Sequence, residues 1–137
     1  MTRVNKRITT FLFVLLAWGV FSQKSDSLTK PKNLTLRQFS RLADNSKKPV
    51  LLCFCADTCR VCKIQEEALA QIVLERHQDM DVVWINLPDN PKIAGYFEIT
   101  SVPVLILYVK GYPVWLRYQL YEKEEIIEYI SPYIVSQ

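Results

Sequence analysis

Two cysteines separated by two residues carry the clearest chemical signal in this sequence. Cys59 and Cys62 follow a continuous apolar run at 50–56 and open a stretch with helical periodicity. Such a run is typical of a strand that is buried on both faces of a sheet. At the start of a helix, unpaired amide N–H groups and the positive end of the helix dipole favour a thiolate over a thiol. The spacing therefore predicts a dithiol that can exchange with a disulfide.

The two cysteines of this pair are expected to have different roles. Cys59 lies where solvent can reach it, so it is the expected attacking thiolate, and the positive charge of Arg60 favours that thiolate further. Cys62 is the expected resolving thiol, more buried, which releases a mixed disulfide. Arg60 and Val61, which lie between the two cysteines, are assigned to substrate binding.

Two further cysteines, Cys53 and Cys55, lie in the apolar run, so all four fall within ten residues. Cysteines that staple a fold are normally spread to close large loops, so the clustering indicates a site. On a strand, Cys53 and Cys55 point to the same face. We interpret them first as small buried hydrophobic residues. The alternatives are a second redox pair or relay to Cys62, and a cluster of all four thiolates that binds Zn or Cu(I).

The first 22 residues have the pattern of a signal peptide. A basic start at 3–7 precedes an apolar run at 8–21, and Val20 and Ser22 fit the small-residue positions of a cleavage site before Gln23. The apolar run has about 14 residues, whereas a membrane-spanning helix needs roughly 20. We expect an exported protein, periplasmic or otherwise extracytoplasmic. An uncleaved anchor is the alternative, and only then would the protein contact a membrane.

Removal of this segment leaves a chain without net charge. Three of the 17 Lys and Arg residues lie in the basic start, and the remaining 14 equal the 14 Asp and Glu residues. The sequence also has no basic run interleaved with aromatic residues. We therefore expect no nucleic-acid partner.

The rest of the pattern predicts a flexible lead at 23–33 and one α/β domain at 34–137. Strands are expected at 50–56, 82–85, 104–109 and 114–118, and helices at 36–45, 59–77, 92–97 and 122–130. This order implies a central mixed sheet of four or five strands with helices on both faces.

Apolar residues at helical spacing predict which side of each helix faces the core. The predicted inward residues are Leu36, Phe39 and Leu42 on the first helix, Ile64, Ala68, Leu69, Ile72 and Val73 on the second, and Ile126, Ile127 and Ile130 on the last.

The segment 50–130 closely resembles the thioredoxin family. The features it shares are the buried strand, the CxxC at a helix start followed by Lys63, the run Asp89–Pro91, the pair Val102-Pro103 before a strand, and a Lys-Gly turn after that strand. The resemblance implies a thioredoxin-like fold. It also implies that Pro103 is cis and faces the dithiol. Val102 would then offer its backbone to an extended substrate peptide.

Several positions depart from the family pattern. The aromatic residue before the first cysteine is Thr58, and the tryptophan of the active-site loop is Cys55. Cys53 replaces the buried acid, which is a proton acceptor beneath the second cysteine, and Trp84 replaces the lysine associated with that acid. The glycine after the fourth strand is Gln119. These changes bear on the efficiency and direction of the chemistry rather than on the fold.

The resemblance implies a thiol–disulfide oxidoreductase that acts on protein thiols or disulfides without a metal or organic cofactor. Its electron partner would be a membrane redox protein. The Arg60-Val61 dipeptide is neither the reductive Gly-Pro nor the oxidative Pro-His type, and a reductase is favoured because the histidine of dedicated oxidases is absent. Two other classes stay open. One is a metal-handling module for Cu(I) or Zn, and the other is an interaction protein whose dithiol no longer turns over.

Overall fold

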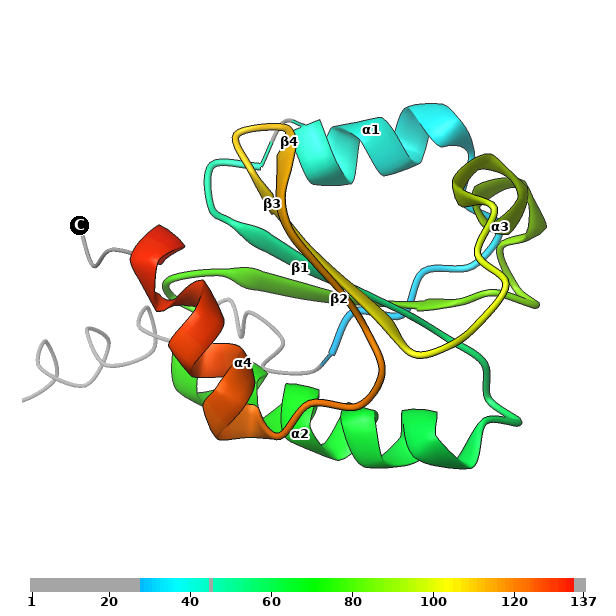
Figure 1. Cartoon of the computed structure of the whole chain (residues 1–137). Coiled ribbons are helices and arrows are strands. Elements are labelled where there is room, and N and C mark those ends of the chain that lie inside the picture. Colours follow the sequence, from blue (N-terminus) through cyan, green and yellow to red (C-terminus); the bar gives the residue numbers. More distant parts are fainter. Residues whose placement is uncertain (1–27, 45, 135–137) are drawn as a thin grey trace, which may run out of the picture.

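Residues 28–44 and 46–134 are described by the computed structural model, which places one four-stranded sheet between two layers of helices (Figure 1). The strands are β1 (Val50–Cys55), β2 (Asp81–Asn86), β3 (Val104–Val109) and β4 (Tyr112–Tyr118). They lie in the order β2-β1-β3-β4, with β1 parallel to β2 and antiparallel to β3. All six residues of β1 are buried, because the strand is paired on both edges and covered on both faces.

Helices cover both faces of the sheet, as the sequence predicts. Figure 1 shows α1 (Leu36–Asp44) and α3 (Pro91–Phe97) over one face, and α2 (Arg60–Arg76) and α4 (Lys123–Ile130) over the other. A short 3-10 helix, η1 (Ser131–Tyr133), follows α4. Thr35 caps α1, since the Gln38 amide donates to the Thr35 hydroxyl oxygen at 3.2 Å. Glu122 and Glu125 form a capping box at the start of α4.

The sheet divides the interior into two apolar layers, because successive side chains of a strand point to opposite faces. Cys53 and Cys55 point toward α2 and α4, where they share a core with Cys62. Phe54, between them in sequence, points to the other face and packs in the core that contains Phe39 of α1. Cys53, Cys55 and Cys62 therefore lie on the same side of the sheet, and Cys59 packs against the same core.

Residues 29–33, at the end of the expected flexible lead, are bound to the sheet and to the loop after β2. Thr29 forms one isolated parallel bridge with Val83, and its carbonyl accepts a hydrogen bond from the Trp84 amide at 2.8 Å. The Asn33 amide donates to the Asp89 carbonyl at 2.9 Å. From residue 28 onward this bridge does not extend into a fifth strand, since Pro31 follows it and has no amide to donate to a ladder.

The predicted signal peptide at 1–22 and residues 23–27 lie outside the described residues. Within the part of the chain that the structure describes, no helix combines the length and the apolar character that a membrane crossing needs.

Two apolar residues that were expected to face the core lie at the surface, Leu36 at 44% exposure and Ile64 at 48%. The buried position next to Ile64 belongs to Gln65, whose side chain is fully enclosed. Its Nε2 donates to the Tyr121 carbonyl at 3.1 Å, and its Oε1 accepts from the Tyr121 amide at 3.0 Å. A buried amide is tolerated here because both of its polar atoms are satisfied. Gln65 thereby ties α2 to the segment that leads into α4.

Gln119 occupies a backbone conformation that suits glycine. Its φ is 106°, in the region where a side chain is strained, and its amide donates to the Pro103 carbonyl at 3.1 Å. A residue held in such a conformation costs about 1–3 kcal/mol. We expect Gln119→Gly to raise the free energy of unfolding by about 1 kcal/mol, measured as a higher urea midpoint at unchanged m value. Gln119→Ala keeps the Cβ and should give no such gain; an equal gain from alanine would show that φ is not the cause.

Candidate active site

A tight turn after β1 places Cys59 at the start of α2. The Cys59 amide donates to the Ala56 carbonyl at 2.9 Å, and the helix begins at Arg60. Cys59 is therefore the N-cap residue, with an extended backbone (φ −83°, ψ 113°). Its sulfur accepts a hydrogen bond from the Cys62 amide, with an N···Sγ distance of 3.2 Å. An amide donor and the positive end of the helix dipole both stabilise negative charge on this sulfur.

The two thiols of the CxxC differ in exposure, as the sequence predicts. Cys59 is half-buried, whereas Cys62 has no exposed surface. All four cysteines are free thiols in the structure. A substrate can therefore reach the Cys59 sulfur, while Cys62 lies beneath it in the first turn of α2.

Cys53 and Cys55 continue inward from this pair. Their sulfurs lie 3.2 Å apart on one face of β1, and neither residue is exposed. Cys55 and Cys62 belong to the same buried core, and each thiol affects the pKa of the other. Cys53, Cys55 and Cys62 thus share one core, and Cys59 packs against it from the start of α2. The structure brings all four together, and the full burial of Cys53 and Cys55 agrees with the packing role that the sequence favoured for them over a relay.

The thiols of Cys55 and Cys62 are held in their protonated form. The pKa of Cys55 is raised well above its usual range, first by its hydrogen bond with Cys53 and then by burial. Burial raises the pKa of Cys62 most, and its hydrogen bonds with Cys59 and Cys55 raise it further. Desolvation has this effect because it disfavours the charged thiolate. Cys62 must therefore lose its proton in an environment that opposes the loss.

The four thiols are not arranged as metal ligands. Across residues 28–44 and 46–134, no group of three or more His, Cys, Asp or Glu side chains is placed to hold a metal ion. A thiolate metal site needs its sulfurs around one central point. Here the sulfurs of Cys53 and Cys55 contact each other on β1, while the Cys59 sulfur accepts from the Cys62 amide at the start of α2. The geometry gives the metal-handling alternative no support.

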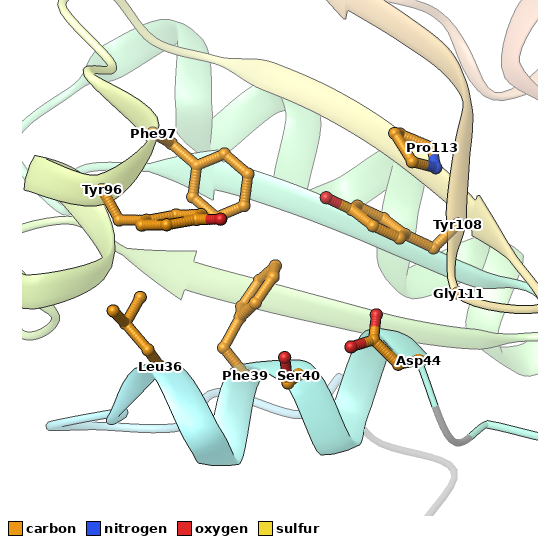
Figure 2. A pocket seen from close by; sticks show the side chains of 9 residues that line it. All are labelled: Leu36, Phe39, Ser40, Asp44, Tyr96, Phe97, Tyr108, Gly111 and Pro113. Atoms are coloured by element: carbon orange, nitrogen blue, oxygen red, sulfur yellow. The ribbon is translucent and has the colours of Figure 1, made fainter.

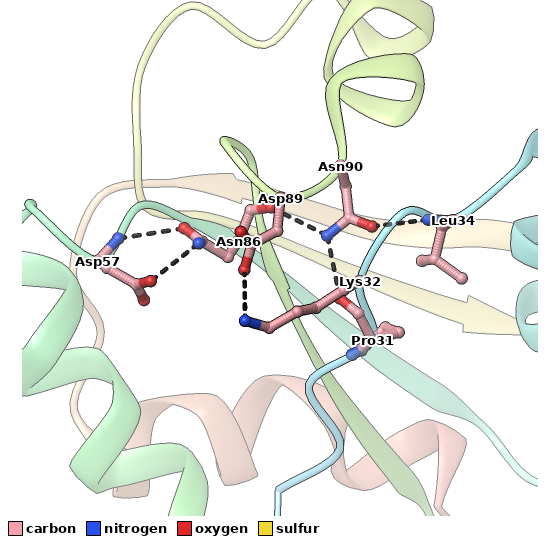
Figure 3. Close-up of polar contacts among 7 residues, drawn as sticks. All are labelled: Pro31, Lys32, Leu34, Asp57, Asn86, Asp89 and Asn90. Atoms are coloured by element: carbon pink, nitrogen blue, oxygen red, sulfur yellow. Dashed lines mark hydrogen bonds and ion pairs between the residues drawn. The ribbon is translucent and has the colours of Figure 1, made fainter.

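A polar network fixes the loop that leads to Cys59 (Figure 3). Asn86, the last residue of β2, accepts a hydrogen bond from the Asp57 amide at 3.1 Å and donates to the Asp57 carboxylate at 2.9 Å. Asn90 is fully buried and donates to the carbonyls of Asn86 at 2.9 Å and Pro31 at 3.0 Å. It also accepts from the Leu34 amide at 2.9 Å. Asp57 therefore has a partner that positions it, and the loop is bound to the end of β2.

Sequence reasoning did not identify Asn86, Asn90 or Gln65 as parts of this framework. A usable signal was the pair of asparagines at the end of an apolar strand and after the turn that follows it. Asparagine side chains bond readily to nearby backbone. Gln65 gave no such signal, because it bonds to the backbone of Tyr121, far along the chain.

The loop before β3 brings Val102 and Pro103 to the same core. The peptide bond between them is cis, as the resemblance implies. Pro103 is buried, and the half-buried Val102 packs against the core cluster that contains Cys55 and Cys62, as does Cys59. The assignment of Val102 and Pro103 to substrate binding stays a prediction.

Arg60 and Val61 are both exposed on the first turn of α2. Val61 is 42% exposed, and Ile64, one turn further along the same face, is 48% exposed. An apolar surface therefore lies directly beside the accessible thiol. The substrate-binding roles of Arg60 and Val61 also stay predictions.

Comparisons with known proteins agree with this geometry. A family model described as Thioredoxin matches residues 30–132. A thioredoxin of Mycobacterium tuberculosis (strain H37Rv) is 40% identical over 70 residues, which span 51% of this chain and only 60% of that protein. A thioredoxin-like protein of Synechocystis sp. (strain PCC 6803) is 30% identical over 101 residues, 72% of this chain and 96% of its own.

A solved structure gives the same fold. A mutant thioredoxin from Halobacterium salinarum NRC-1 superimposes with a TM-score of 0.70 at 20% sequence identity, covering 82% of this chain and 95% of that one. At this identity the likeness concerns the fold alone.

Proposed function

The chain belongs to the thioredoxin family, and from this premise we propose that it is a thiol–disulfide oxidoreductase that exchanges a Cys59/Cys62 dithiol with protein substrates. The observation that carries the proposal is the hydrogen bond from the Cys62 amide to the Cys59 sulfur at 3.2 Å. It places an accessible sulfur at a helix N-terminus, with a second, buried sulfur in the same turn.

In the reducing direction, the Cys59 thiolate attacks one sulfur of a substrate disulfide. A bond forms between Cys59 and that sulfur, the substrate S–S bond breaks, and the departing thiolate takes up a proton. Cys62 then loses its proton and attacks the Cys59 sulfur, which releases the second substrate sulfur and leaves a Cys59–Cys62 disulfide. Two electrons pass to the substrate, and the same steps in reverse oxidise a substrate dithiol.

Two features support a peptide as the substrate. Val61 and Ile64 present apolar surface beside Cys59. Val102, in the cis-proline loop, packs against the same core as the two active cysteines. We propose that an extended segment pairs with the Val102 backbone while its apolar side chains rest on Val61.

We also propose that reduction is the physiological direction, with a membrane redox protein as electron donor. The dipeptide Arg60-Val61 supports this, because it lacks the histidine of dedicated oxidases. The equilibrium potential of the Cys59–Cys62 disulfide against glutathione tests the direction. A potential near the oxidising end of the range of about −270 to −120 mV would contradict it.

A second candidate function is an interaction protein whose dithiol does not turn over. The observation that favours it is the raised pKa of the buried Cys62 thiol. Insulin reduction driven by dithiothreitol separates the two candidates. The proposed enzyme reduces insulin and Cys59→Ser does not, whereas an inert dithiol gives no rate above that of dithiothreitol with either protein. Metal analysis after anaerobic purification tests the metal-handling alternative directly.

We propose that the protein is exported, on the strength of the basic, apolar and small-residue order of its first 22 residues. N-terminal sequencing of the mature protein is expected to begin at or near Gln23. Recovery of an intact Met1 in a membrane fraction would contradict cleavage and support an anchor.

A further inference from the structure

A cavity of about 430 Å³ opens on the face of the sheet opposite the cysteines (Figure 2). It lies between α1, α3 and the hairpin of β3 and β4, and the thiol chemistry makes no use of it. Its size suits a side chain or a small ligand. The groups that line it decide which ligand it can select.

Four aromatic rings line the cavity. Phe39 and Phe97 meet edge to face, with ring centroids 5.0 Å apart, and Tyr96 packs on Phe97 at the same distance. Tyr108 packs on Phe39 at 6.1 Å. Figure 2 shows the hydroxyl groups of Tyr96 and Tyr108 pointing toward one another across the space. The cavity therefore offers ring surface and two hydroxyl oxygens.

The only charged residue among those lining the cavity is Asp44, the last residue of α1. Its carboxylate points toward Tyr108 in Figure 2. Burial raises the pKa of the Tyr108 phenol, and the charge of Asp44 raises it further. Within the described residues Asp44 takes part in no ion pair. The field inside the cavity therefore favours a positive charge.

Asp44 is the last residue of α1, where its negative charge destabilises the helix. The C-terminal end of a helix carries partial negative charge, so a carboxylate there is destabilising and a cation is favoured. The hairpin closes tightly over this residue, since a Cβ added to Gly111 would lie 3.3 Å from the Asp44 Cα. Gly111 has a φ of +84°, which other residues rarely adopt. The fold thus places an exposed acid at the rim of an aromatic cavity, at the negative end of a helix.

We propose that this cavity binds the guanidinium group of an arginine side chain or of a free arginine-like cation, with the ring faces of Tyr96 and Tyr108 beside it and Asp44 as its counter-ion. A guanidinium group fits because it stacks on aromatic faces and carries five donors in one plane. The acceptors that line the cavity are the Asp44 carboxylate, the two phenol oxygens and the Ser40 hydroxyl.

The test is an NMR titration of the full chain with N-acetyl-arginine methylamide and, in parallel, with its neutral isostere, the citrulline compound. We expect saturable shifts for residues of α1, α3 and the hairpin, with citrulline at least about tenfold weaker. A bound cation should also lower the pKa of Tyr108. A capped pentapeptide with central arginine distinguishes the sources, since tighter binding of the peptide indicates a protein partner and tighter binding of the amide indicates a small molecule.

Matched variants separate binding from packing. Asp44→Asn keeps the shape of the side chain and should weaken arginine binding about three- to tenfold, while raising the urea midpoint of the free protein. Tyr96→Leu should also weaken binding, because it removes one of the two ring faces. Tyr96 is 65% exposed, so it can be replaced without opening the core. Glu128→Gln, the same charge change on the exposed surface of α4, should have no effect on binding. Equal affinity for arginine and citrulline, an unchanged affinity of Asp44→Asn, or no saturable shift would overturn the proposal.

Discussion

Cys62→Ser is expected to convert the protein into a trap that holds substrates on Cys59 as stable mixed disulfides. The substitution leaves the half-buried attacking sulfur in place and removes the buried thiol that would attack it. Turnover in the insulin assay should fall to background. The trapped species should appear on non-reducing gels and disappear with dithiothreitol, and mass spectrometry should locate the link at Cys59.

Cys59→Ser is the matched variant, because it removes the accessible sulfur and keeps the buried one. It should trap no substrate. Equal trapping by both variants would contradict the assignment of attacking and resolving roles. Cys53→Ala and Cys55→Ala test the inner thiols in the same assay. Most of the turnover should survive if they only pack, whereas a large loss from either change in a folded protein would support a relay to Cys62.

Release of a mixed disulfide by Cys62 is expected to be slow at neutral pH and to accelerate about tenfold for each pH unit. The reason is that burial raises the pKa of the Cys62 thiol, so its thiolate is scarce at pH 7 and increases as the pH rises toward that pKa. Rapid-quench measurement of the Cys59–glutathione mixed disulfide between about pH 6 and 9 gives the profile. A release rate that does not change over this range would contradict the expectation.

A proton acceptor placed beneath Cys62 should relieve this barrier. Cys53 stands where the resemblance puts the buried acid, and it lies in the same core as Cys62. We therefore expect Cys53→Asp to accelerate release at pH 7 and to flatten its pH dependence, since a carboxylate that reaches the Cys62 proton directly or through one water can act as its general base. Cys53→Asn has similar size and cannot take up the proton, so it should give no acceleration. Should Cys53→Asp fail to fold, the pH profile of the unaltered protein still tests the role of Cys62 burial.

The sequence alone determined the features that depend on neighbouring residues. The apolar run at 50–56 identified the central strand, because a strand covered on both faces has no polar side to show. The spacing of Cys59 and Cys62 placed the dithiol at a helix start, and the structure confirms Cys59 as the N-cap of α2. The order of periodic segments was enough for the mixed sheet and its two helical layers.

Tertiary structure decided what surrounds these elements. Helical periodicity predicted that Ile64 would be buried, but the core lies on the side of Gln65, whose amide is satisfied by the distant backbone of Tyr121. The contact of Cys55 with Cys62 likewise depends on how closely α2 packs over β1.

The aromatic cavity beside Asp44 shows the same limit. Its walls come from α1, α3 and the β3–β4 hairpin, three segments that meet only in the folded chain. Periodicity and dipoles act over a few residues, so a sequence displays them directly. Burial, pKa shifts and cavities depend on which segments pack together, and only the folded chain decides that.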